Sequence, residues 1–68
     1  MNAAQQEFAR NFRKPSTPRS LARDWQEAER IAKEYGVKAH PLGKAKSYNS
    51  YGWVDWERLE GDILAKLA

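Results

Sequence analysis

The sequence predicts an α+β fold, a small single domain in which a helix, a β-hairpin and a helix follow a basic N-terminal arm or short extra helix. Two stretches, 20–35 and 56–67, carry apolar residues at helical spacing. Between them the period changes to the alternation typical of strands, over 37–40 and over 50–54. A length of 68 residues allows only one core, and a modest one, because so short a chain buries a limited fraction of its surface.

The N-terminal stretch 3–13 predicts a short helix, because Ala4, Phe8 and Phe12 fall on one helical face. A helix of this length is marginal in water when it is isolated. The two phenylalanines are therefore expected either to dock on the core or to form a loose anchor that becomes ordered on binding.

A linker follows over 14–19, where two prolines prevent a continuous helix. We therefore divide the chain into a basic arm with a proline linker, 1–19, and a helix–hairpin–helix domain, 20–68. On this division, deletion of residues 1–14 is expected to leave the fold nearly unchanged.

The stretch 20–35 predicts the first long helix. Ser20 is suited to cap its N-terminus, and Gly36 is suited to end it in the left-handed conformation. Val37 is expected to fold back on the last turn. The apolar stripe comprises Leu21, Trp25, Ala28, Ile31, Ala32 and Tyr35.

The two alternating stretches, 37–40 and 50–54, are expected to pair as an antiparallel hairpin with a long basic tip at 43–49. Pro41 is expected to end the first strand or to confine it to an edge. On the second strand, Trp53 is expected to face the core.

The last helix is predicted over 56–67, with Asp55 as its N-cap. Gly61 interrupts the pattern and implies either a break or the close approach of another backbone. The predicted core comprises Leu21, Trp25, Ala28, Ile31, Val37, Trp53, Leu59, Ile63 and Leu67.

One short motif resembles a known DNA-binding element. Residues 31–37 (Ile-Ala-Lys-Glu-Tyr-Gly-Val) resemble the first helix and turn of a helix-turn-helix motif. That motif needs a recognition helix directly after the turn, whereas the next residues read as extended. A short helix followed by a two-stranded wing, as in small winged-helix excisionase-type proteins, is the alternative.

The composition excludes several functional classes. The chain has no cysteine and one histidine, His40, so disulfides and the usual structural zinc site are excluded. No apolar run approaches the roughly 20 residues of a membrane span, and we expect a cytoplasmic protein without a membrane partner. The sequence has no glycine-rich phosphate loop and no nucleophile motif that would pair with His40, so we expect neither an enzyme nor a cofactor.

The stretch 44–56 (Lys-Ala-Lys-Ser-Tyr-Asn-Ser-Tyr-Gly-Trp-Val-Asp-Trp) indicates a recognition module. It holds four of the eight aromatic residues, together with two lysines and a spacer of Ser, Asn and Gly. Recognition loops favour this mixture, because Tyr and Trp offer large contact areas at low entropic cost. Lysines next to aromatics also suit a nucleic-acid surface, where rings stack on bases.

The basic residues are segregated along the chain. Residues 1–23 carry five basic side chains against Glu7 alone, and residues 37–52 carry three lysines and no acid. The leading hypothesis is therefore non-catalytic nucleic-acid binding by an accessory or regulatory protein, a monomer or homodimer. The candidate binding residues are Arg10, Arg13, Lys14, Arg19 and Arg23 in the arm, Lys38, Lys44 and Lys46 in the hairpin, and the aromatics Tyr48, Tyr51 and Trp56.

Two alternatives stay open. The same aromatic loop suits a small inhibitor or adaptor that binds a host protein, of the kind that phages and mobile elements encode. Trp56 is suited equally to the core and to an exposed anchor.

Overall fold

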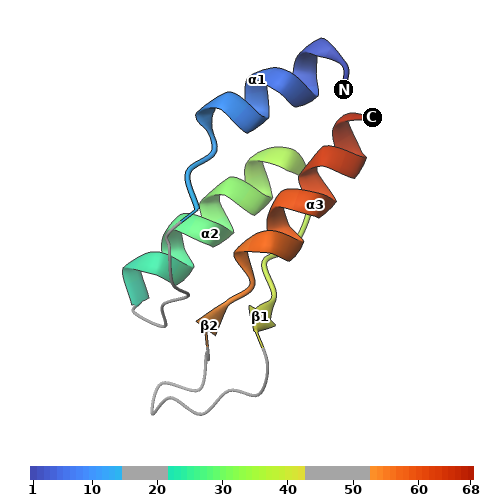
Figure 1. Cartoon of the computed structure of the whole chain (residues 1–68). Helices are drawn as coiled ribbons and strands as arrows, with labels where there is room; N and C mark the ends of the chain where they lie inside the picture. Colours follow the sequence, from blue (N-terminus) through green and yellow to red (C-terminus); the bar gives the residue numbers. More distant parts are fainter. Residues whose placement is uncertain (15–21, 43–52) are drawn as a thin grey trace.

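The computed structural model describes residues 1–14, 22–42 and 53–68, with the side chains of the first long helix from Asp24 onward. It confirms the α+β fold, a compact domain of helices and one antiparallel hairpin (Figure 1). The predicted boundary between 19 and 20, the Ser20 cap, Leu21 and the tip 43–49 lie outside the described residues. The elements are α1 (Ala3–Asn11), α2 (Ala22–Tyr35), β1 (Pro41–Leu42), β2 (Trp53–Val54) and α3 (Trp56–Leu67).

Helix α3 lies at the centre of the fold. Both α1 and α2 pack against it, whereas no Cα atom of α1 lies within 8 Å of a Cα atom of α2. Strand β2 packs on α2 and leads directly into α3. The strands lie at the end of the molecule away from the two chain termini (Figure 1).

The N-terminus of α1 is fastened to the C-terminus of α3. Asn2 and Gln5 form a capping box, in which each side chain accepts a hydrogen bond of 2.8 Å from the backbone N–H of the other. The same two amides donate across to α3, from Asn2 Nδ2 to the Leu67 carbonyl and from Gln5 Nε2 to the Leu64 carbonyl, both at 2.9 Å. These carbonyls belong to the last turn of α3, which has no intrahelical donors for them.

The apolar face of α1 is part of the core. Phe8 is only 5% exposed, and Phe12 packs on the buried cluster. The Phe8 ring stacks on Phe12 at a centroid distance of 4.9 Å and meets Tyr35 of α2 edge-on at 5.2 Å. Of the two expected roles for these phenylalanines, the structure shows the docked one. The burial of Phe8 argues against the expectation that residues 1–14 are dispensable for folding, because their loss would uncover this face.

Helix α2 ends as the sequence predicts. Gly36 has a φ of 73°, in the left-handed region, and its N–H donates to the Lys33 carbonyl at 3.2 Å. The N–H of Val37 donates to the Ala32 carbonyl at 2.9 Å, which completes a Schellman motif. Val37 folds back on the core, as expected. The residues that follow are not helical, so the helix-turn-helix resemblance ends at the turn.

The first strand begins later than predicted. Residues 37–40 are not part of a strand, and the first strand starts at Pro41 rather than ending there. The register pairs Pro41 with Val54 and Leu42 with Trp53. One further hydrogen bond, from Asp55 N to the His40 carbonyl at 2.9 Å, continues the pairing toward α3.

The inward face of β2 is the opposite of the predicted one. Val54 is fully buried, whereas Trp53 is 52% exposed, so its assignment to the core was wrong. Neighbouring strand residues point to opposite faces, and only one of the two can reach the core. Trp56, in the first turn of α3, is 7% exposed and belongs to the buried cluster, so its alternative role as an exposed anchor is wrong as well.

Helix α3 has the predicted bounds. The Asp55 side chain caps it by accepting from Arg58 N at 3.0 Å. Gly61 neither breaks the helix nor receives a neighbouring backbone, because a Cβ built there would meet nothing within 4 Å. The described core comprises Phe8, Trp25, Ala28, Ala32, Val54, Trp56, Leu59 and Ile63, with Ile31, Val37 and Leu67 of the predicted set partly buried around it.

The first prediction tests the docking of α1. Phe8→Ala is expected to lower the free energy of unfolding by about 3–5 kcal/mol, the usual loss for a buried aromatic. For a domain of this size that is a large part of the total stability. Urea unfolding followed by tryptophan fluorescence measures it. Glu7→Ala, an exposed change on the same helix, is the control and should stay within about 0.5 kcal/mol. Equal effects of the two changes would show that α1 is not anchored by Phe8.

The second prediction uses two glycines in contrasting settings. Gly61→Ala is expected to stabilise the protein by roughly 1 kcal/mol, because alanine is the better helix former and the added methyl has open space. Gly36→Ala is expected to destabilise it by about 1–2 kcal/mol, because a Cβ disfavours the left-handed conformation. Thermal unfolding of the two variants should shift in opposite directions. A shift in the same direction would contradict the assignment of one of these positions.

Candidate recognition surface

An exposed apolar pair lies on the outer face of the hairpin. Leu42 is 41% exposed and Trp53 is 52% exposed, and they stand directly opposite each other in the strand register. Opposed residues of an antiparallel pair share a face, so the two side chains form one surface, which we call the hairpin patch. It lies at the base of the segment 43–52, which carries Lys44, Lys46, Tyr48 and Tyr51 and lies outside the described residues.

Sequence reasoning missed both members of the hairpin patch. Trp53 was assigned to the core, and Leu42 was given no role. The one available signal was the adjacency of Trp53 and Val54, since a short strand cannot bury both.

Of the basic residues on and just after α1, Lys14 lies against the start of α3. Arg10 and Arg13 are exposed, and Arg13 Nη1 donates to the Arg10 carbonyl at 3.3 Å. Lys14 Nζ donates to Glu60 Oε1 at 3.0 Å and lies 4.0 Å from Glu57 Oε2. The positive charge of Lys14 is therefore opposed by two acids of α3, which makes it a poorer phosphate ligand than the sequence suggests.

Lys38 lies apart from the arm residues. It follows the turn at Gly36, and a Cβ at Gly36 would lie 3.7 Å from Lys66 Cε in the last turn of α3. Together with Lys33 it lines a shallow hollow beside this turn. The structure therefore does not bring Lys38 together with Lys14. Of the other predicted binding residues, Arg19 lies outside the described residues, and Arg23 is on α2 with a side chain that is not described.

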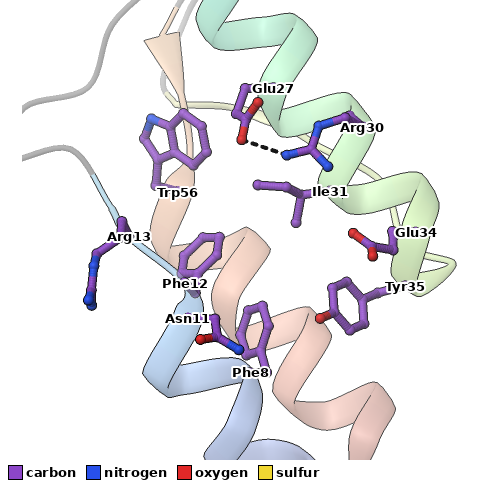
Figure 2. A pocket seen from close by; sticks show the side chains of 10 residues that line it. All are labelled: Phe8, Asn11, Phe12, Arg13, Glu27, Arg30, Ile31, Glu34, Tyr35 and Trp56. Atoms are coloured by element: carbon purple, nitrogen blue, oxygen red, sulfur yellow. Dashed lines mark hydrogen bonds and ion pairs between the residues drawn. The ribbon is translucent and has the colours of Figure 1, made fainter.

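A groove runs between α1 and α2, and Figure 2 shows it from close by. Its volume is about 420 Å³. We call it the aromatic groove, because Phe8, Phe12, Tyr35 and Trp56 line its apolar part with Ile31. The Phe12 and Trp56 rings are 6.4 Å apart between centroids and tilted by 53°, so the wall is not flat. Its polar lining residues are Asn11, Arg13, Glu27, Arg30 and Glu34.

The described part of the chain offers little for metal or acid–base chemistry. Within residues 1–14, 22–42 and 53–68, no group of three or more His, Cys, Asp or Glu side chains is placed to hold a metal ion. His40 is half-buried, and its contribution to the fold is the backbone carbonyl that accepts from Asp55 N. In the same ranges, no helix is long and apolar enough to cross a membrane.

Comparison with known proteins leaves the site without an assigned role. No protein-family model matches the chain, and neither a curated protein nor a solved structure matches it. The function must therefore be argued from the residues and their geometry.

The third prediction concerns the Lys14 ion pair. The hydrogen bond to Glu60 is the main cause that raises the pKa of Lys14 above the ordinary lysine value of 10.5, and the charges of Glu60 and Glu57 add to it against a lowering by desolvation. A raised pKa means that the pair stabilises the fold below pH 10.5 and ceases to do so as the pH rises past the Lys14 pKa. NMR titration of the Lys14 side chain should show this rise.

Glu60→Gln is the matching variant. It is expected to return the Lys14 pKa toward 10.5, whereas Asp62→Asn, which removes a carboxylate that pairs with Arg58, should leave it in place. An unchanged Lys14 titration in Glu60→Gln would show that the pair does not persist in solution. Because Lys14 is 36% exposed, salt should also weaken the pair.

Proposed function

We propose that this chain is a non-catalytic recognition protein that binds a partner protein through its hairpin, as a small inhibitor or adaptor would. The observation that carries the proposal is the half-exposed Trp53 opposite the exposed Leu42. A tryptophan side chain buries about 150–250 Å² when covered, and tryptophan is enriched among the residues that dominate binding energy. A cytoplasmic location and the absence of a cofactor belong to the same proposal.

The hairpin patch is held on a rigid base, which favours binding. Val54, next to Trp53, is fully buried, and the Asp55 N–H is hydrogen-bonded to His40. Asp55 also caps α3, so the chain is fixed on the helical side of Trp53. An anchor that is ordered before binding loses less entropy when the partner covers it. The Tyr, Ser, Asn and Gly composition of 43–52 supplies adaptable contacts beside this anchor.

The charges of the described residues support a protein partner over a phosphate backbone. Lys14 is paired with Glu60, and Arg30 is paired with Glu27 at 2.7 Å. Glu57 is exposed at the start of α3, close to the hairpin. A mixed surface of this kind lacks the concentrated positive charge that duplex binding uses.

Nucleic-acid binding is the second candidate, and a specific observation favours it. Arg10 and Arg13 are exposed and take part in no salt bridge within the described residues, and Lys44 and Lys46 lie in the segment next to Trp53. Trp53 would then stack on a base while these side chains contact phosphates. The sequence pI of about 9.5 is compatible with this role.

The fourth prediction separates the two candidates. Tagged protein is used to capture partners from host lysate with and without nuclease, and the affinity for the captured partner is then measured. Trp53→Ala is expected to weaken binding by about 30-fold, a hot-spot loss of 2 kcal/mol. Its free energy of unfolding should change little, because the ring is half-exposed. Glu7→Ala serves as the folded, exposed control.

Salt and nuclease decide between the classes of partner. Capture that survives nuclease, with an affinity nearly independent of salt, supports the protein partner. Capture that nuclease abolishes, with a log–log salt slope of about −3 to −5, would support the nucleic-acid candidate instead. Equal binding by Trp53→Ala and the unchanged protein would remove the hairpin patch from either account.

A further inference from the structure

The aromatic groove lies on a different part of the surface from the hairpin patch and is walled by two helices that do not touch through their backbones. Because α1 and α2 each rest on α3, the space between them is bridged by side chains alone, above all by the edge-on contact of Phe8 with Tyr35. Phe12, Ile31 and Tyr35 are only partly buried, so apolar surface faces the groove. The volume of about 420 Å³ falls in the range of ligand sites, about 300–1,000 Å³.

The α2 wall of this groove carries two carboxylates against one guanidinium. Arg30 forms an ion pair with Glu27 at 2.7 Å, and the more distant charge of Glu34 acts on the same guanidinium, so one negative charge is left over on this wall. Glu34 forms no salt bridge among the described residues, and its carboxylate is directed toward the groove beside Ile31 and Tyr35 (Figure 2). The Arg13 side chain lies at the left of the view and is directed away from the rings (Figure 2). The end of the groove near Glu34 therefore carries a net negative charge beside exposed aromatic surface.

We propose that the aromatic groove binds an arginine side chain of a partner peptide, with its guanidinium paired to Glu34. The planar, weakly hydrated guanidinium stacks on aromatic rings, here Phe12 or Tyr35, and its paired N–H groups match a carboxylate. The methylene stem of the same side chain packs on Ile31. This site goes beyond the hairpin patch and does not depend on it, because its residues come from α1, α2 and the first turn of α3.

The test uses a defined probe, the peptide acetyl-Ala-Phe-Arg-Ala-amide, titrated into the ¹⁵N-labelled full chain. A matched peptide carries citrulline, which has nearly the shape of arginine without its charge. Saturable NMR shifts are expected at the amides of Ile31, Glu34 and Tyr35 and at the Trp56 indole, with a Kd of about millimolar order for so small a probe. The citrulline peptide is expected to bind about tenfold more weakly.

Two substitutions on α2 complete the design. Glu34→Gln should weaken the arginine peptide about tenfold and bring it level with the citrulline peptide. Glu29 is also exposed on the same helix but lines the hollow beside Lys33, so Glu29→Gln should leave the affinity unchanged. The spectra of both variants report whether the fold is intact. The proposal is overturned by equal affinity for the two peptides, by equal effects of the two substitutions, by shifts centred on Trp53, or by the absence of saturable shifts.

Discussion

Burial of α3 is the constraint on which the rest of this structure depends. Leu59 and Ile63 are fully buried, and each of the other helices packs on α3. Both ends of α3 are completed by side chains from outside the helix: Asp55, directly before it, caps its N-terminus, while Asn2 and Gln5 supply donors to the carbonyls of its last turn. A chain of this length without disulfides has little core to lose, so the contribution of α1 is part of the fold's stability rather than an addition to it.

The elements whose signals are local could be predicted from the sequence. Gly36 and Asp55 mark helix ends through their own backbone and side-chain chemistry, and both ends were predicted correctly. Which face of β2 points to the core could not be predicted from its own residues. Trp53 and Val54 are both apolar, and only the packing of the whole fold decides that Val54 is buried and Trp53 half-exposed. The apolar face of α1 was likewise predicted, but the surface that it would meet on Tyr35 and Trp56 was not.

The candidate surface was less predictable than the fold, because its charges are set by pairs distant in sequence. Lys14 and Glu60 are 46 residues apart, and their contact exists only because α1 docks beside the start of α3. The segregation of basic residues along the chain therefore overstated the positive charge available at the surface. Similarly, the aromatic groove joins α1 to α2 across α3, so no stretch of sequence displays it.

Four consecutive residues link the hairpin patch to the folding of α3. Trp53 faces outward, Val54 is buried, Asp55 caps the helix and Trp56 enters the core. A shift of one residue in this stretch would bury Trp53, expose Val54 and move the cap away from the first turn of the helix. The positions of Val54, Asp55 and Trp56 therefore keep Trp53 exposed. Trp53 stays half-exposed even though the chain has few large apolar side chains for its core. A side chain held outward in this way is oriented before any partner arrives, which is the physical basis for assigning recognition to the hairpin.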